Sequence, residues 1–190
     1  CGGCNVGINQ KSSRAVFNDR DHRLISLYQT LQQTEERGVF SYIEKTIAHY
    51  CLSRTAEYGY DRYGCSSNSG LGKYNKEKYL QLRDDFNKKD PADKDYYLMM
   101  YVLILFSFNN QIRFNQSGEF NLPVGKRDFN SRMEKKLSKF IRRIHNMDYT
   151  FTNLDFRDFP LEELEADSFI YADPPYLITC ATYNERSGWG

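Results

Sequence analysis

Apolar side chains recur every three or four residues along several stretches of the chain. This spacing places them on one helix face and predicts amphipathic helices over 24–31, 40–51 and 131–146. Residues 96–108 are apolar on every side, which is typical of a buried helix. The pattern therefore predicts one central helix and several that cover it.

Short apolar runs near both ends of the sequence indicate strands. They cover 15–17, 149–153 and 168–172, and the first is followed by Asn18-Asp19. Polar and apolar residues alternate over 111–123 around Gln116-Ser117-Gly118, which predicts a hairpin.

The segment 53–74 has no clean period and contains four glycines and four tyrosines. We expect a long loop there, and such loops are uncommon unless they are functional or mobile. A helix is predicted to follow over 75–88, with Asn75 as its N-cap.

The predicted order is a strand, a helical block with a hairpin, and then strands again. This order favours an α/β sheet interrupted by a mostly helical insertion. The 190 residues suffice for one domain or two small ones. No apolar run approaches the ~18 residues that span a bilayer, so we do not expect a membrane protein.

The formal net charge of +1 does not point to nucleic acid, but it conceals a local asymmetry. Residues 126–143 hold eight basic and two acidic side chains, a local charge of +6. Residues 155–167 hold six acids and one arginine. The basic helix face over 132–143 is either a solvated surface or a phosphate contact, and the adjoining hairpin favours the phosphate contact.

The five cysteines are irregularly spaced, and no signal peptide precedes them. A disulfide framework is therefore not expected, and the pattern favours a reducing, cytoplasmic compartment. Cys1 and Cys4 have no second close Cys or His pair, so we expect no metal site.

Asp173-Pro174-Pro175-Tyr176 is the tetrapeptide that says most about chemistry. Two prolines end the preceding strand and fix a rigid turn, which places the Asp173 carboxylate at the carboxyl end of the strand. Ligands bind at that edge of open α/β sheets. Taken alone, the tetrapeptide is also consistent with an ordinary strand-ending turn.

The surrounding motifs resemble those of Dam-like DNA adenine-N6 methyltransferases, which use S-adenosylmethionine. Asp173–Tyr176 resembles their catalytic motif, Cys1-Gly2-Gly3 the end of their glycine loop, and Asn18-Asp19 the ribose-binding acid. Residues 79–87 and 112–127 resemble a family helix and the DNA-reading hairpin. The segments around Asp155, Phe156 and Asp158, and around Tyr183-Asn184, also match, so the resemblance runs over essentially the whole chain.

The resemblance implies a Rossmann-like methyltransferase sheet with a mostly helical target-recognition insertion that carries a β-hairpin. It implies catalytic domain segments at 1–24 and 147–190 and a DNA target-recognition domain at 25–146. The chain begins at Cys1 rather than Met, and we expect it to be a piece that lacks both ends of the catalytic domain. That expectation leaves open whether the chain alone binds cofactor or turns over.

The resemblance also implies roles for individual residues. Asp173 and the Pro174 carbonyl would accept hydrogen bonds from the adenine N6, and Tyr176 would stack on a flipped-out base. The implied catalytic set is Asp173, Pro174, Pro175 and Tyr176. The implied S-adenosylmethionine set is Gly2, Gly3, Asp19, Asp155, Phe156 and Asp173. Simple core packing is the alternative interpretation of Phe156.

For DNA, Arg113 is assigned to a guanine because arginine fits the O6 and N7 pair bidentately. The resemblance places Asn109, Gln111, Asn115 and Pro123 near bases, while Lys126 and Arg127 are assigned to phosphates. GATC is the family's commonest target and is our expectation for duplex DNA. A monomer is expected, and a cognate restriction endonuclease is one candidate partner.

Two alternatives stay open on the sequence alone. One is a DNA-binding fragment without catalysis, since both ends of the catalytic domain are missing from the chain. The other is a related methyltransferase that acts on RNA or on protein amide nitrogen. Enzymes of that kind usually carry Asn where Asp173 stands, and they lack the hairpin.

Overall fold

The structure is a computed structural model and describes residues 2–172. The strands are β1 (Arg14–Asn18) and β2 (Asp148–Thr152). The helices are α1 (Asn5–Ile8), α2 (His22–Gln33), α3 (Glu36–His49), α4 (Thr55–Tyr58), α5 (Gly72–Lys88), α6 (Tyr96–Phe106) and α7 (Ser131–Asn146). Short 3-10 turns are η1 (Asp61–Tyr63), η2 (Phe108–Asn110), η3 (Phe156–Asp158) and η4 (Leu161–Glu163).

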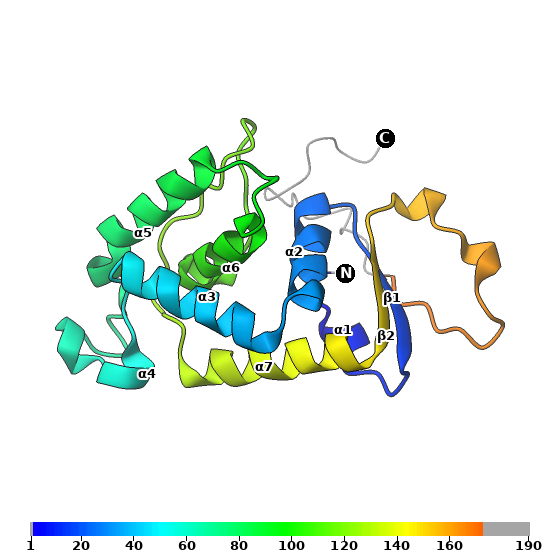
Figure 1. Ribbon diagram of the computed structural model, residues 1–190, viewed down its shortest axis with the longest axis horizontal. Coiled ribbons are helices and arrows are strands. Elements are labelled where there is room, and N and C mark those ends of the chain that lie inside the picture. Colours follow the sequence, from blue (N-terminus) through cyan, green and yellow to red (C-terminus); the bar gives the residue numbers. More distant parts are fainter. Residues whose placement is uncertain (1, 173–190) are drawn as a thin grey trace.

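The two strands pair in parallel, with Arg14 opposite Asp148 and Asn18 opposite Thr152. Parallel strands require a crossover connection, and here all helices from α2 to α7 lie within it. Figure 1 shows the longer helices gathered on one side of the sheet. Residues 153–172 leave the sheet on its other side in the same view. The described part is thus a mixed helix and strand fold with a small parallel sheet, compatible with the α/β class.

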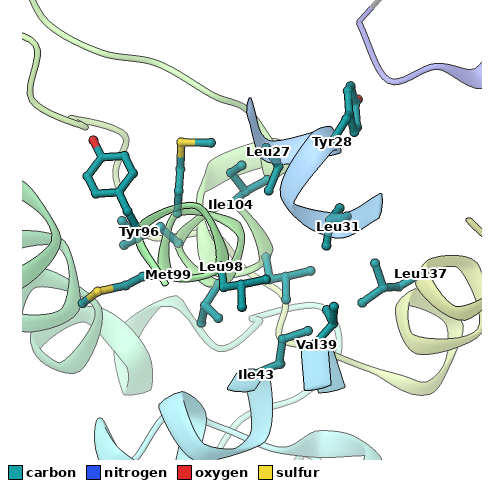
Figure 2. Packing of buried hydrophobic residues seen from close by; sticks show 14 of the residues in the cluster. Leu27, Tyr28, Leu31, Val39, Ile43, Tyr96, Leu98, Met99, Ile104 and Leu137 are labelled. Carbon is teal, nitrogen blue, oxygen red and sulfur yellow. The ribbon is translucent and has the colours of Figure 1, made fainter. Parts of the chain in front are cut away.

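Helix α6 is the centre of the core. Nine of its eleven residues are buried, as its uniformly apolar sequence predicts. Figure 2 shows Leu98 and Ile104 of α6 surrounded by side chains of neighbouring helices. These neighbours include Leu27, Leu31, Val39, Ile43 and Leu137. Each surrounding helix contributes the apolar face that its sequence period predicts.

The amphipathic helices and the strands over 15–17 and 149–153 are confirmed, with ends that differ by a few residues. The hairpin is also confirmed. Phe114 and Phe120 form an antiparallel bridge, and the turn uses Gly118 at a φ of 80°. The predicted loop at 53–74 contains the short turns α4 and η1 and gives way to α5 at Gly72.

The prediction that Asn75 caps a helix is wrong. Helix α5 begins at Gly72, and the Asn75 backbone N–H already donates to the Leu71 carbonyl, 2.9 Å away. The side chain of Asn75 is buried and bonds to Ser53 instead. Because the Asn75 side-chain amide is hydrogen-bonded to Ser53, it does not cap its own helix.

The predicted strand at 168–172 is also wrong. No strand is assigned there, and the side chains of Phe169, Ile170 and Tyr171 are exposed. A strand needs a neighbour for its backbone hydrogen bonds, and within residues 2–172 the sheet consists of β1 and β2 alone. An apolar run specifies burial only where such a neighbour exists.

A buried polar network is centred on Asp128. Asp128 is fully buried and accepts hydrogen bonds from the Thr55 N–H at 2.7 Å, the Thr55 hydroxyl at 2.7 Å and the Ser53 hydroxyl at 3.1 Å. Asn75 bonds to the same serine. The network ties the loop after α3 to the segment that follows the hairpin.

No helix within residues 2–172 is both long enough and apolar enough to cross a membrane.

Replacing Asp128 by alanine is expected to lower the free energy of unfolding by about 3 kcal/mol, because one buried donor and two partly buried donors lose their acceptor. Urea unfolding followed by circular dichroism measures the change. Asp84→Ala, on the exposed side of α5, removes the same charge and should cost under ~0.5 kcal/mol. Equal stability of Asp128→Ala and wild type would contradict this account.

Candidate functional site

The two predicted cofactor elements near the start of the chain lie together. The Gly2 N–H donates to Asp19 Oδ2 at 3.2 Å, although 17 positions separate the residues. Gly2 has a φ of 48°, and a Cβ at that position would meet nothing within 4 Å. The turn therefore leaves open space beside the carboxylate, which suits close approach of a ligand to the backbone.

Asp19 follows β1 directly and is partly buried. Its Oδ1 accepts from the Asp21 N–H at 3.0 Å, and its carbonyl accepts from Asn153 Nδ2 at 2.7 Å. A carboxylate has about four acceptor sites, so backbone donors and a ribose hydroxyl can share one such group. The residues present therefore fit a ligand that carries hydroxyl groups.

Tyr28 and Cys4 pack against the turn that contains Gly2. The Tyr28 hydroxyl donates to the Gly2 carbonyl at 2.5 Å. Cys4 is buried, and burial raises the pKa of its thiol to about 11. The buried Cys4 side chain therefore packs as part of the core.

Asp155 lies at the start of η3, where its side chain accepts from the Arg157 N–H. The Arg157 guanidinium also donates to both carboxylate oxygens, at 2.9 and 3.0 Å. These bonds hold the pKa of the Asp155 carboxyl well below its usual range. Phe156 is 66% exposed, so the core-packing interpretation of its ring is wrong. An exposed aromatic ring thus follows directly after a carboxylate that accepts hydrogen bonds from Arg157.

The hairpin presents its predicted DNA residues differently from one another. Asn109, Gln111, Pro123, Lys126 and Arg127 are all exposed. Arg113 is partly buried, and its guanidinium donates from Nε to Asn121 Oδ1 at 2.8 Å and from Nη2 to the Asn121 carbonyl at 2.9 Å. Asn115 Nδ2 donates to Glu119 Oε2 at 2.8 Å, and Asn115 Oδ1 accepts from the Glu119 N–H at 2.9 Å. Asn115 therefore serves the hairpin turn in this structure.

Sequence reasoning missed Phe108, which precedes the hairpin and is 47% exposed. The next two residues, Asn109 and Asn110, adopt left-handed φ values of 55° and 53°. Asn110 Nδ2 donates to the carbonyls of Ile104 and Leu105 and so closes the end of α6. An exposed aromatic ring beside this well-supported left-handed turn makes Phe108 a candidate ligand contact. The sequence pattern that could have indicated it is the position of Phe108 at the end of the apolar run 96–108, after the polar Ser107.

The first turn of α2 connects the turn around Asp19 with the hairpin. Asp21 caps α2 by accepting from the Arg23 N–H at 3.0 Å. The Arg23 guanidinium lies over the Phe114 ring, 4.1 Å from its centroid. Arg23, whose side chain contacts the hairpin, therefore lies four positions after Asp19 in the sequence.

The basic face of α7 lies elsewhere. Figure 1 shows α7 along the edge of the molecule opposite the tip of the yellow-green hairpin. Arg142 pairs with Glu36 at 2.9 Å, and Arg143 donates to the Gln10 carbonyl at 2.7 Å. The structure does not bring this basic face to the hairpin. Two of its arginines, Arg142 and Arg143, bond to groups of the protein itself.

The catalytic residues predicted at Asp173, Pro174, Pro175 and Tyr176 lie outside the described residues. Within residues 2–172, no three His, Cys, Asp or Glu side chains gather as metal ligands would.

Comparison with known proteins gives a consistent result. The family model for D12 class N6 adenine-specific DNA methyltransferases matches residues 1–187. Modification methylase StsI of Streptococcus sanguinis is 34% identical over 187 residues, and Type II methyltransferase M.FokI of Planomicrobium okeanokoites is 33% identical over 187 residues. Each alignment covers 97% of this chain and 25% of the relative, so the chain spans about a quarter of their length.

A DNA adenine methylase of Escherichia coli K12 is 26% identical over 183 residues, which are 96% of this chain and 56% of that protein. The similarity therefore extends across the glycine turn, the helical block, the hairpin and the Asp-Pro-Pro-Tyr segment. The chain belongs to the D12 class of N6 adenine-specific DNA methyltransferases.

Proposed function

We propose that this protein transfers a methyl group from S-adenosylmethionine to N6 of an adenine flipped out of duplex DNA. The observation that carries the proposal is the contact between Arg23 and Phe114. This contact links the hairpin to the first turn of α2, which follows the turn that holds Gly2 and Asp19. A methyl donor and a target base must meet within one site, and this arrangement suits that requirement.

S-adenosylmethionine would supply an electrophilic methyl group on its sulfonium. Asp19 would bind the ribose hydroxyls, Gly2 and Gly3 would allow close approach of the backbone, and Asp155 and Phe156 would border the adenine. The exposed ring of Phe156 supports that assignment, because it presents a flat face for stacking.

Chemistry at N6 needs a localised lone pair, because the amino nitrogen shares its electrons with the ring. The Asp173 carboxylate and the Pro174 carbonyl would accept hydrogen bonds from the two N6 hydrogens and localise the lone pair. Tyr176 would stack on the extruded base. Phe108 offers an exposed ring at the hairpin entrance that would fill the vacated position in the duplex.

Sequence selection would rest on the hairpin. Arg113 would contact a guanine, with Asn109, Gln111, Asn115 and Pro123 near other bases and Lys126 and Arg127 at phosphates. GATC is the first target to test. Residues 25–146 would form the target-recognition domain, inserted between segments of a Rossmann-like catalytic domain at 1–24 and 147–190.

The names of the relatives support a setting in which methylation protects DNA from a cognate endonuclease. We propose that the protein acts as a monomer in the cytoplasm. The matching family is described as DNA methyltransferases and the Escherichia coli K12 relative is named a DNA adenine methylase, which favours duplex DNA over RNA or protein amide nitrogen as the substrate.

The full-length protein carrying Asp173→Ala is expected to lose methyl transfer to duplex DNA, because N6 loses its carboxylate acceptor. Transfer of tritium from S-adenosyl-[methyl-³H]methionine measures the effect. Asp167→Ala, in the exposed acidic segment, is the matched control and should retain wild-type rates. Full activity of Asp173→Ala would refute the mechanism, and wild-type transfer to RNA or protein alone would refute the substrate.

Arg113→Ala is expected to reduce discrimination at one guanine by about 1–3 kcal/mol, because the bidentate contact is lost. Relative kcat/KM values on duplexes that vary at single positions measure this discrimination. Lys126→Ala should instead weaken binding to all sequences and lower the salt slope by about 1. An unchanged specificity profile for Arg113→Ala would rule out its assignment.

A further inference from the structure

One face of α5 lies along the return arm of the hairpin, residues 120–122. Tyr79, Arg83 and Asn87 are spaced four residues apart, so their side chains project from the same face of the helix. The Tyr79 hydroxyl donates to the Leu122 carbonyl at 3.1 Å, and Arg83 Nη1 reaches the same carbonyl at 3.4 Å. The helix thus supplies the hydrogen-bonding neighbour that a strand would supply in a sheet.

Asn87 makes the most specific of these contacts. The Phe120 N–H donates to Asn87 Oδ1 at 2.8 Å, and Asn87 Nδ2 donates to the Phe120 carbonyl at 3.1 Å. A carboxamide offers one acceptor and one donor group, as the backbone of a paired strand residue does. This reciprocal pair fixes the register of the arm, because a shift by one residue would break both bonds.

The apolar side chains of the arm are anchored in the core. Phe120 and Leu122 are each 1% exposed. Phe120 packs edge-to-face on Phe114 across the hairpin, with ring centroids 5.4 Å apart, and on Phe86 of α5 at 6.1 Å. Core packing and the Asn87 pair together hold the arm in one position.

Asn121 lies between these two anchored residues and contacts Arg113. Its Oδ1 and its carbonyl accept from Nε and Nη2 of the guanidinium, at 2.8 and 2.9 Å. Two bonds to one planar group set its orientation as well as its position. The orientation of the Arg113 side chain therefore depends on the backbone at 120–122.

We propose that Asn87 is a positioning residue for sequence selection, which acts by holding the arm that orients Arg113. The inference rests on the proposed function, in which Arg113 contacts a guanine. Asn87 itself is bonded to the protein backbone and is given no DNA contact. Base recognition tolerates little displacement of the side chain that contacts the base. Loss of the hydrogen bonds that α5 makes to the arm (the clamp) should therefore lower sequence selectivity more than it lowers the rate of methyl transfer.

The chain provides a matched control on the same helix. Asn75 of α5 is also an asparagine with two hydrogen bonds, one from the Ser53 N–H to Oδ1 and one from Nδ2 to the Ser53 hydroxyl, both at 2.9 Å. These bonds support the loop after α3 rather than the hairpin. A generally structural role would make Asn75→Ala and Asn87→Ala behave alike.

The experiment uses the full-length protein and a pool of DNA duplexes with randomised bases around an adenine. Methylated positions are mapped by sequencing, and thermal unfolding is recorded for each variant. Asn87→Ala is expected to lower the preference for the favoured base at the position read by Arg113 about tenfold, with a smaller loss of kcat. Asn75→Ala is expected to lower the Tm and keep the wild-type preference.

A wild-type preference in folded Asn87→Ala would overturn the inference, as would an equal loss of preference in Asn75→Ala. If Asn87→Ala does not fold, Tyr79→Phe tests the same clamp, because it removes only the hydroxyl bond to Leu122. A preference lowered about threefold in Tyr79→Phe supports the inference, and an unchanged one overturns it. If the wild-type protein methylates no adenine, the proposed function is refuted and the inference with it. If the wild type methylates selectively and the variants keep its preference, only the inference about the clamp is refuted.

Discussion

The burial of α6 is the constraint on which the rest of the structure depends. A helix that is apolar on every side cannot face water, so other elements must cover it all round. Helices α2, α3 and α5 pack directly on it. Two of these carry the candidate site: α2 begins beside Asp19, and α5 holds the hairpin. The site is therefore positioned by the same contacts that form the core.

The hairpin begins where this buried helix ends. Ser107 follows α6 and forms an antiparallel bridge with Val124 at the base of the hairpin. The Gly125 N–H donates to the Phe106 carbonyl at 2.7 Å, and a Cβ at Gly125 would lie 2.4 Å from the Ser107 carbonyl oxygen. Glycine is needed there because the two backbones approach too closely for any side chain. The base of the hairpin is thus anchored to the end of the most buried helix in the described part of the chain.

Hydrophobic period predicts the helices well here because each covers the core with one face, and α6 is recognised because it lacks a polar face. The hairpin is also predictable, since its turn needs a left-handed Gly118. The failures share a cause: they depend on partners that are distant in sequence. Asn75 bonds to Ser53 rather than capping its helix, and the apolar run at 168–172 has no strand beside it in the described part.

The candidate site divides in the same way. The proximity of Gly2 and Asp19 follows from a resemblance in motif order, and the structure brings them together. The support of the hairpin arm by Asn87 has no local signature because the contact joins α5 to a segment 33 positions later. The contact of Arg113 with Asn121 depends on the register of the hairpin, which the sequence pattern does not specify. Nor does the charge pattern of α7 reveal that Arg142 and Arg143 are engaged within the fold.

The chain passes twice between the proposed catalytic and recognition regions, and neither passage is a linker. The first proposed boundary falls inside α2 (His22–Gln33), whose residues contact both β2 and α6. At the second, Met147 alone separates the end of α7 from the start of β2. Along the backbone there is no stretch at which one region ends before the other begins. Modularity, in the sense of a recognition unit that is exchanged by cutting at loops, is therefore absent from this part of the protein: a graft would have to divide a helix or carry the shared core with it.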